Sequence, residues 1–246
     1  DIRATIEDEA SKLNINDFLT VALPSSILDT PTGRALYALT LDEKYDSIFE
    51  GYNSLGENKL PREEVIANIY DWMDSNTEPV QYGGGVEDAL YYRYDNEYKA
   101  RNAKFETMKE LAMVRGIDDD FLEAFFSHLT VYAAAGKINI NTAPVEVITG
   151  LLMAYAMDPL TSENAKEAAE LVLEYRDITP FSKAEDFVTF CQNDLQLSLM
   201  GAEGTMDPGA NQGVSQQKIQ DILGTESKVF TIKSTGYSGQ ARVTIT

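Results

Sequence analysis

Lys137–Asn141 reads KININ, and Thr142, Ala143 and Pro144 follow it directly. Isoleucine at alternate positions is typical of a short buried strand, and the threonine and proline that follow are typical of the first turn of a helix. The same pattern occurs near the start of the chain, where Lys12–Asn16 reads KLNIN. An asparagine at the end of each strand suits an Asx turn or a helix cap. The two peptides predict two similar strand-to-helix junctions in one sheet, with an internal duplication as the alternative.

Helical patterns occupy most of the rest of the chain. Apolar residues spaced three and four apart predict helices, and threonine, aspartate and proline mark where several of them begin. The longest predicted helix covers about 162–176, with a stripe of alanines and Val172 as its apolar face. The other predicted helices begin near Pro31, Pro61, Asp118 and Pro144, or cover about 102–115.

The two ends of the chain carry different patterns. Residues 230–245 alternate between apolar and polar side chains around Gly236 and Gly239, which predicts an antiparallel hairpin. At the other end, apolar residues recur at helical spacing and predict the end of a helix over Ile2–Leu13. The sequence thus predicts an α+β chain with β structure at its ends and helices between them.

The composition excludes several classes of function. The chain has 246 residues, of which 43% are hydrophobic, so it can bury a sizeable core. Its formal net charge of −20 argues against binding nucleic acid through phosphates and against docking on an anionic membrane surface. One cysteine excludes an internal disulfide, and one histidine argues against histidine relays and His-rich zinc sites.

An acidic segment, residues 71–92, is the best candidate for a site. It carries five carboxylates and one asparagine, but neither lysine nor arginine. Crowded carboxylates repel one another, and a hard divalent cation such as Ca²⁺ removes that penalty by binding their oxygens. The spacing is not that of an EF-hand, because Pro79 stands where that loop requires glycine. The alternative is a solvated acidic loop without a metal.

Three further groups of residues have structural interpretations. Asp118–Asp120 lie in the first turn of a predicted helix, where carboxylates cap N–H groups and complement the helix dipole. His128 and Cys191 each follow buried aromatic residues and are expected to pack rather than to react. Tyrosines such as Tyr91 and Tyr98 are expected either on a contact surface or between core and solvent.

A DNA-binding module is the alternative function. Residues 138–152 and 179–190 together look like a helix-hairpin-helix, a module that binds phosphates through the N–H groups of a glycine-rich hairpin. Asp118 stands where the second hairpin glycine after Gly116 should be, and the chain after Leu151 has no hairpin glycine. We therefore expect the module to be a packing scaffold.

Four features in the same order resemble the K subunit of the type II secretion system, a family of minor pseudopilins also called general secretion pathway protein K. Each feature is weak alone, and together they span nearly the whole chain. They are KLNIN at Lys12–Asn16, DWMDSN at Asp71–Asn76 followed by GVED at Gly85–Asp88 and Tyr91-Tyr92, ININTAP at Ile138–Pro144 followed by Glu146, and the closing strand-glycine-strand of Phe230–Ile245.

This resemblance implies a fold and a domain organisation. The expected fold is a pilin-like N-terminal helix and small antiparallel sheet that carry a large helical insertion, SAM-like or helix-hairpin-helix-like. Residues 1–22 and 228–246 would form the pilin-like core, which strands near 129–141 are candidates to join. Residues 23–227 would form the insertion, with halves of about 30–128 and 142–224.

The resemblance also implies a role in assembly rather than catalysis. The subunit would join the I and J minor pseudopilins at the tip of the periplasmic pseudopilus of a Gram-negative bacterium and help to initiate or cap the filament for protein secretion. The family's leader and apolar helix lie upstream of the part matched here, so we expect anchoring in the inner membrane through an N-terminal helix. No nucleic-acid partner and no enzyme activity are expected.

Bound calcium in the helical region is a further implication of the resemblance. We transfer the ligand role to the residues of the acidic segment that match the family's pattern. These are Asp74, Asn76, Glu87 and Asp88, with Glu78 and Asp71 as additional candidates.

Overall fold

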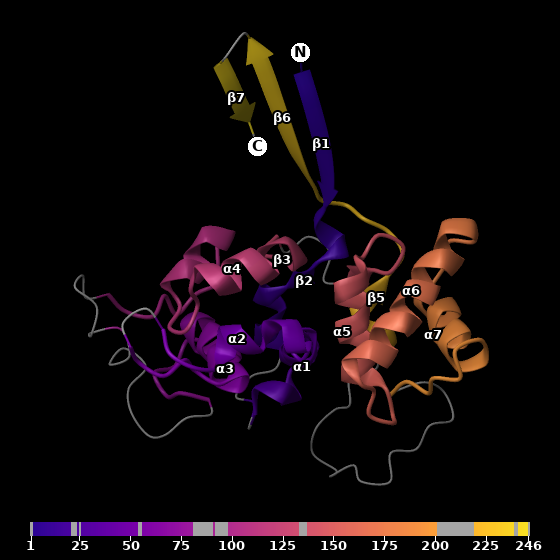
Figure 1. Ribbon diagram of the computed structural model, residues 1–246, viewed down its shortest axis with the longest axis horizontal. Coiled ribbons are helices and arrows are strands. Elements are labelled where there is room, and N and C mark those ends of the chain that lie inside the picture. The colour runs from indigo at the N-terminus through magenta and orange to yellow at the C-terminus, as the bar shows by residue number, and fades with distance from the viewer. Residues whose placement is uncertain are drawn as a thin grey trace.

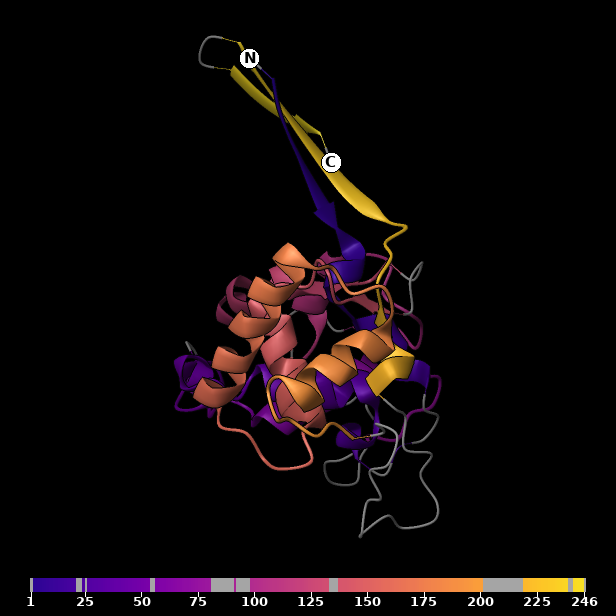
Figure 2. The same ribbon diagram turned by 90° about the vertical axis from the view of Figure 1, so that its right-hand side faces the viewer.

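A three-stranded antiparallel sheet stands out from a helical body (Figure 1). The computed structural model describes residues 2–20, 24, 26–53, 56–80, 91, 98–132, 137–200, 219–238 and 241–245. The sheet, called the arm below, has the order β1-β6-β7 and consists of β1 (Ile2–Asp8), β6 (Phe230–Ser238) and β7 (Ala241–Ile245). A view at right angles shows the same projection (Figure 2), and both ends of the chain lie on the arm.

The first residues form a strand, so the helix predicted over Ile2–Leu13 is wrong. β1 pairs with β6 from Ile2 opposite Gly236 to Asp8 opposite Phe230. The pattern alone does not separate helix from strand here, because apolar residues at 2, 6 and 10 fit a period of two as well as a helical period. The intervening residues Arg3, Thr5 and Glu7 complete a strand pattern. The predicted C-terminal hairpin is confirmed as β6 and β7.

The short strands near 129–141 do not join the arm. β2 (Leu13–Asn14) pairs in parallel with β3 (Leu129–Thr130), and β4 (Ile138–Asn139) pairs in parallel with β5 (Leu223–Gly224). The two asparagine-rich peptides thus lie in separate two-stranded sheets, so the prediction of one shared sheet is wrong. Each sheet is only two residues long on both strands, too short for a sequence pattern to reveal its partner.

The first half of the body is built from short helices between β2 and β3. Its helices are α1 (Pro31–Leu39), α2 (Asp46–Phe49), α3 (Arg62–Met73) and α4 (Asp119–Phe125). Thr30 caps α1 as predicted, since its Oγ1 accepts a hydrogen bond from the Gly33 N–H at 3.0 Å. Among the described residues, 3₁₀ helices cover Glu9–Ser11 just before β2 and then Ile15–Thr20, Ile27–Asp29, Glu43–Tyr45, Met108–Met113 and Phe126–His128.

The helix predicted over 102–115 is shorter than expected. Only Met108–Met113 is helical, and it is a 3₁₀ helix. Glu110 explains the late start, because its Oε1 accepts hydrogen bonds from the N–H groups of Glu106 and Thr107 and so caps the helix at residue 108.

The second half of the body lies between β4 and β5. It contains α5 (Val145–Tyr155), α6 (Ser162–Ile178), α7 (Ala184–Asn193) and α8 (Ile219–Ile222). The starts of α5 and α6 confirm the predictions from Pro144 and from the 162–176 pattern. Of the helices in the described part of the chain, none combines the length and the apolar character needed to cross a membrane.

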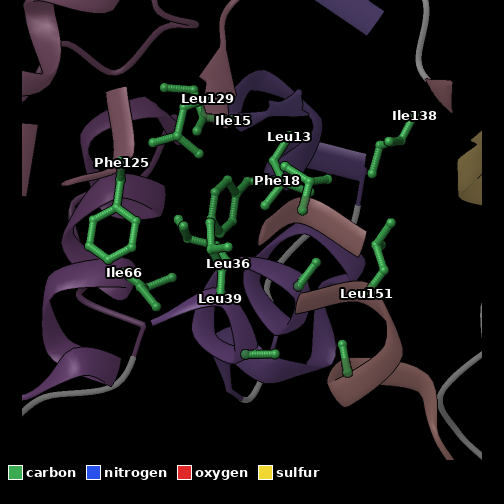
Figure 3. Close-up of a cluster of buried hydrophobic side chains, with 14 of the residues drawn as sticks. Leu13, Ile15, Phe18, Leu36, Leu39, Ile66, Phe125, Leu129, Ile138 and Leu151 are labelled. Atoms are coloured by element: carbon green, nitrogen blue, oxygen red, sulfur yellow. The ribbon is translucent and has the colours of Figure 1, made fainter. Parts of the chain in front are cut away.

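One hydrophobic core joins the two halves. Leu13, Ile15, Phe18 and Leu36 gather around the first asparagine-rich peptide (Figure 3), and Leu151 of α5 belongs to the same core. α1 packs closely on α5 because α5 has a glycine at the contact. A Cβ at Gly150 would lie 3.2 Å from the Ala35 carbonyl oxygen and 3.2 Å from the Leu39 backbone nitrogen.

The two halves repeat the same polar arrangement. In the first, Asn16 exchanges two hydrogen bonds with the backbone of Phe105, and in the second, Asn141 does the same with Phe181. Five residues after each phenylalanine, a carboxylate accepts hydrogen bonds from two backbone N–H groups, at Glu110 in the first half and at Asp186 in the second. These shared contacts favour the duplication interpretation of the two peptides.

Candidate functional site

The acidic segment begins in the last turn of α3. Asp71 is buried there, and its Oδ1 accepts a hydrogen bond from the Val80 N–H at 3.1 Å. Asp74 follows α3 directly, is also buried, and accepts a hydrogen bond from the Asn76 side chain. Asn76 in turn accepts one from the Glu78 N–H at 2.7 Å. The loop therefore folds back over the end of α3 and encloses two carboxylates.

These two carboxylates have too few favourable partners for buried anions. Burial raises the pKa of Asp71 to about 7, the Val80 N–H lowers it in part, and the Asp74 carboxylate raises it further. Burial also raises the pKa of Asp74 above its usual range. The Oδ1 atom of Asp74 is buried without a hydrogen-bond partner. The negative end of the α3 dipole lies at the same place, so the local field favours a cation.

The structure places four of the six predicted metal ligands. Asp71, Asp74 and Asn76 lie together, whereas Glu78 is exposed on the outer side of the loop. Glu87 and Asp88 lie outside the described residues. Within the part of the chain that the structure describes, no three His, Cys, Asp or Glu side chains are grouped closely enough to hold a metal ion by themselves.

An aromatic cluster borders this loop. Trp72, between the two buried aspartates in sequence, has its ring centroid 5.3 Å from that of Tyr91 and 6.0 Å from that of Tyr98. The Nε1 atom of Trp72 is buried without a hydrogen-bond partner. Tyr91 is fully buried, so it lies neither on a contact surface nor between core and solvent, the two places predicted for the tyrosines. Trp72 is the single tryptophan of the chain and therefore reports on the acidic segment.

A second polar network, which sequence reasoning missed, joins the arm to the body. Glu9 is buried, and its carboxylate accepts hydrogen bonds from Thr130 at 2.6 Å and from Thr231 at 2.5 Å. Lys12 lies 3.1 Å from the same carboxylate. Glu9 thus ties β1, β3 and β6 together where the arm begins. Its partners are 121 and 222 residues away in sequence, so no local pattern could reveal them.

One face of the arm is apolar and exposed. In an antiparallel sheet, residues directly opposite one another share a face, so the register places every second residue of all three strands on this face. Each of its large side chains is at least half exposed. This arm face consists of Ile2, Ile6, Phe230, Ile232, Val243 and Ile245.

The remaining candidates have structural roles. The Oδ1 atom of Asp118 accepts a hydrogen bond from the Phe121 N–H at 3.0 Å, which confirms the predicted helix cap. Cys191 is fully buried, and burial raises the pKa of its thiol to about 12. Burial also lowers the pKa of His128. A thiol that stays protonated does not act as a nucleophile near neutral pH.

Comparison with known proteins agrees with the sequence resemblance. The chain is 27% identical over 168 residues to type II secretion system protein K of Pectobacterium carotovorum subsp. carotovorum, an alignment that covers 68% of this chain and 47% of that protein. The chain therefore spans about half the length of this curated relative.

The fold has a counterpart among solved structures. A chain in the crystal structure of the GspK-GspI-GspJ complex from the enterotoxigenic Escherichia coli type 2 secretion system matches with a TM-score of 0.67 at 16% sequence identity. The match covers 99% of this chain and 72% of that one. The family described as type II secretion system (T2SS), protein K, matches residues 11–134, about half of the sequence. This chain belongs to the type II secretion system protein K family.

Proposed function

We propose that this chain is the K-type minor pseudopilin of a type II secretion system and assembles with I and J subunits at the tip of the pseudopilus. The observation that carries the proposal is the family match over residues 11–134. The fold supports it, because a chain of similar fold was solved in a complex named for the K, I and J proteins. In this role the subunit initiates or caps the filament for protein secretion.

The arm gives the proposal a physical basis. A soluble protein rarely leaves a contiguous apolar surface uncovered, so the exposed arm face calls for a partner. A pilin-type helix, packed along the strands, would bury it. On this proposal the arm is the pilin-like core. The two halves of the body are SAM-like or helix-hairpin-helix-like units inserted into it, and the inserted part begins before residue 23, because Leu13, Ile15 and Phe18 pack in the core of the body. Such a subunit would work in the periplasm, held to the inner membrane by an apolar N-terminal helix.

The role is one of assembly rather than catalysis. The buried thiol of Cys191 supports this, since its raised pKa keeps it protonated. The DNA-binding alternative has little physical support, because a net charge of −20 repels a phosphate backbone.

We further propose that the acidic segment binds calcium. The orphan Oδ1 of buried Asp74 and the raised pKa of Asp71 fit a binding site for a cation. Asp71, Asp74 and Asn76 would hold the ion, with Glu78, Glu87 and Asp88 as the further candidates from sequence. Bound calcium would supply positive charge that neutralises the buried carboxylates, and the chain's own residues would then fix the loop against α3.

Co-purification tests the assembly role. The full-length protein, tagged at the C-terminus, should elute together with the I and J subunits of its own secretion system. Ile6→Asp combined with Ile232→Asp on the arm face should reduce this recovery strongly. Met113→Asp, a change at an exposed apolar residue of the body, is the matched control and should leave recovery unchanged. Failure of the unmodified protein to recover either subunit would contradict the proposal.

A further inference from the structure

α6 exposes a row of apolar side chains near its C-terminal end. Leu171 is 48% exposed, Tyr175 is 38% exposed and Ile178 is 86% exposed. Their spacing of four and then three residues places them on one side of the helix. This row, called the α6 seam below, lies next to the buried stripe that faces α5 and is not part of it.

A row of carboxylates runs along the same helix beside the seam. Its members also follow a spacing of four and three, and all are exposed. Among the described residues, none of them forms a salt bridge. This acidic ridge consists of Glu163, Glu167, Glu170, Glu174 and Asp177.

The exposed end of α6 follows the spacing of one heptad of a coiled coil, whereas Ala168, one heptad before Tyr175, is buried in the body. If Tyr175 is an a position, then Leu171 and Ile178 are d positions, and Glu167 and Glu174 fall at g, directly beside the seam. Apolar a and d residues attract a second helix, and charges at g select the residues that flank the partner's seam. We propose that the α6 seam docks an α-helix of a partner protein whose own apolar seam is flanked by lysine or arginine.

Contacts with the rest of the body fix the position and rotation of α6. The Tyr175 ring packs on Phe190 and Phe181, with centroid distances of 4.3 Å and 5.2 Å. Arg176 donates hydrogen bonds to the carbonyl oxygens of Ile140 and Ala143, each at 2.7 Å, which fixes the rotation of the helix. A surface that is already ordered loses little entropy on binding.

The charges decide between possible occupants. A second copy of this chain would bring glutamates against glutamates, and each copy carries a net charge of −20. An anionic membrane would be repelled in the same way. A basic helix meets complementary charge on the side of the seam where Glu167 and Glu174 lie. This inference does not depend on the proposed tip assembly, which involves the arm rather than α6.

Two designed peptides test the proposal on the whole chain. Both are helical, with leucine at a and d, but one has lysine and the other glutamate at e and g. Titrated against the protein at low salt and followed by the anisotropy of a label on the peptide, the lysine peptide should bind and the glutamate peptide should not. A scrambled peptide of the lysine composition controls for simple attraction to an acidic protein and should bind at least about tenfold more weakly.

Substitutions on α6 make the test specific. Ile178→Asp should weaken binding of the lysine peptide by about tenfold or more, while Ile245→Asp on the arm, the matched control, should not. Glu167→Lys with Glu174→Lys should reverse the preference toward the glutamate peptide, and the same change at exposed Glu123 and Glu185 should not. The proposal would be overturned if Ile178→Asp left the affinity for the lysine peptide unchanged and the charge reversal left the preference between the peptides unchanged. Self-association that Ile178→Asp abolishes would also overturn it, since the occupant would then be a second copy.

Discussion

Asn16 and Asn141, which are 125 positions apart in the sequence, hold their surroundings with the same two hydrogen bonds. The Oδ1 atom of each accepts the N–H of a phenylalanine at 2.9 Å, and the Nδ2 atom donates to the carbonyl oxygen of that same phenylalanine. Each asparagine side chain thereby pairs with both the N–H and the carbonyl group of its phenylalanine. Both phenylalanines lie outside helices and strands, so these groups have no ladder or helix partner. Asn16 makes one more such bond, to the Val131 carbonyl oxygen at 2.8 Å, and is only 3% exposed.

We expect Asn16→Ala to destabilise the protein more than Asn141→Ala. The first change leaves three buried backbone groups without partners, and the second leaves two that are nearer to solvent. Unsatisfied buried groups cost about 1–3 kcal/mol each, with partial relief from water, so we expect losses of about 3 kcal/mol and about 1.5 kcal/mol in the free energy of unfolding. Urea denaturation measures both. Asn193→Ala, at an exposed site on α7, should change little, and equal losses at positions 16 and 141 would contradict the argument.

Gly150→Val should weaken the contact between α1 and α5. A side chain at this position meets the Ala35 carbonyl oxygen and Leu39 at 3.2 Å, and the branched valine needs more room than a single Cβ. Overpacking of this kind costs about 1–3 kcal/mol. The control is Gly236→Val in β6, where a Cβ meets nothing within 4 Å and valine suits a strand. In thermal unfolding, Gly150→Val should therefore lower the melting temperature clearly more than Gly236→Val does.

Acid should loosen the junction between arm and body. Burial by itself would raise the pKa of Glu9, but hydrogen bonds from Thr130, Thr231 and Lys12 outweigh it and lower the pKa below the usual 4.5. A lowered carboxyl pKa stabilises the fold above about pH 4.5, and this contribution is lost as the pH falls through the folded-state value. Glu9→Gln should lower stability at neutral pH and flatten its decline below pH 4.5. A parallel decline in the variant and the parent would show that Glu9 is not responsible, and Glu123→Gln is the exposed control.

Chelation should destabilise the protein if the acidic segment binds calcium. A ligand at about 100 times its dissociation constant adds about 2.7 kcal/mol to the free energy of unfolding, so EDTA should lower the melting temperature by several degrees. The fluorescence of Trp72 should change when calcium is restored, because the tryptophan lies between the two buried aspartates. Asp74→Ala with Glu87→Ala should abolish both responses, and Asp158→Asn at an exposed site should leave them intact. An identical melt with and without EDTA, together with no metal in native mass spectrometry, would reject the calcium proposal.

Local signals in the sequence predicted most of the helices but few of the contacts between them. Thr30 and Asp118 begin helices where expected, because a cap acts on residues two or three positions away. At the start of the chain, residues 2, 6 and 10 fit both a helical period and a period of two, and only the pairing with β6 decides between them. The partners of β2 and β4 were not predictable, since each depends on a strand more than 80 residues distant.

The candidate site shows the same limit. The family resemblance named six candidate ligands in the acidic segment. The fold brings three of them, Asp71, Asp74 and Asn76, together at the end of α3. The resemblance could not show that Asp74 has an orphan oxygen, because burial depends on the packing of the whole loop. The α6 seam was also missed, since an amphipathic helix pattern does not say which apolar residues its own fold leaves uncovered.

The bulk of the body leads to the last prediction, that this subunit occurs once per pseudopilus and at its tip. A globule of the size of residues 23–227 has a radius of gyration of about 17 Å and would be about 43 Å across. Pilin-like subunits stack by packing the helix of one against its neighbours, and a body this wide beside the arm should obstruct a subunit added on its outer side (Figure 1). Gold labelling of the C-terminus in assembled pseudopili should therefore mark one end of each filament.

A variant lacking 30–128 would be the wrong control, because the core joins both halves and the variant would not fold. Ile178→Asp, which changes only the α6 surface, is the better one and should leave the label at the tip. Label spread along the shaft of unmodified pili would contradict the steric argument.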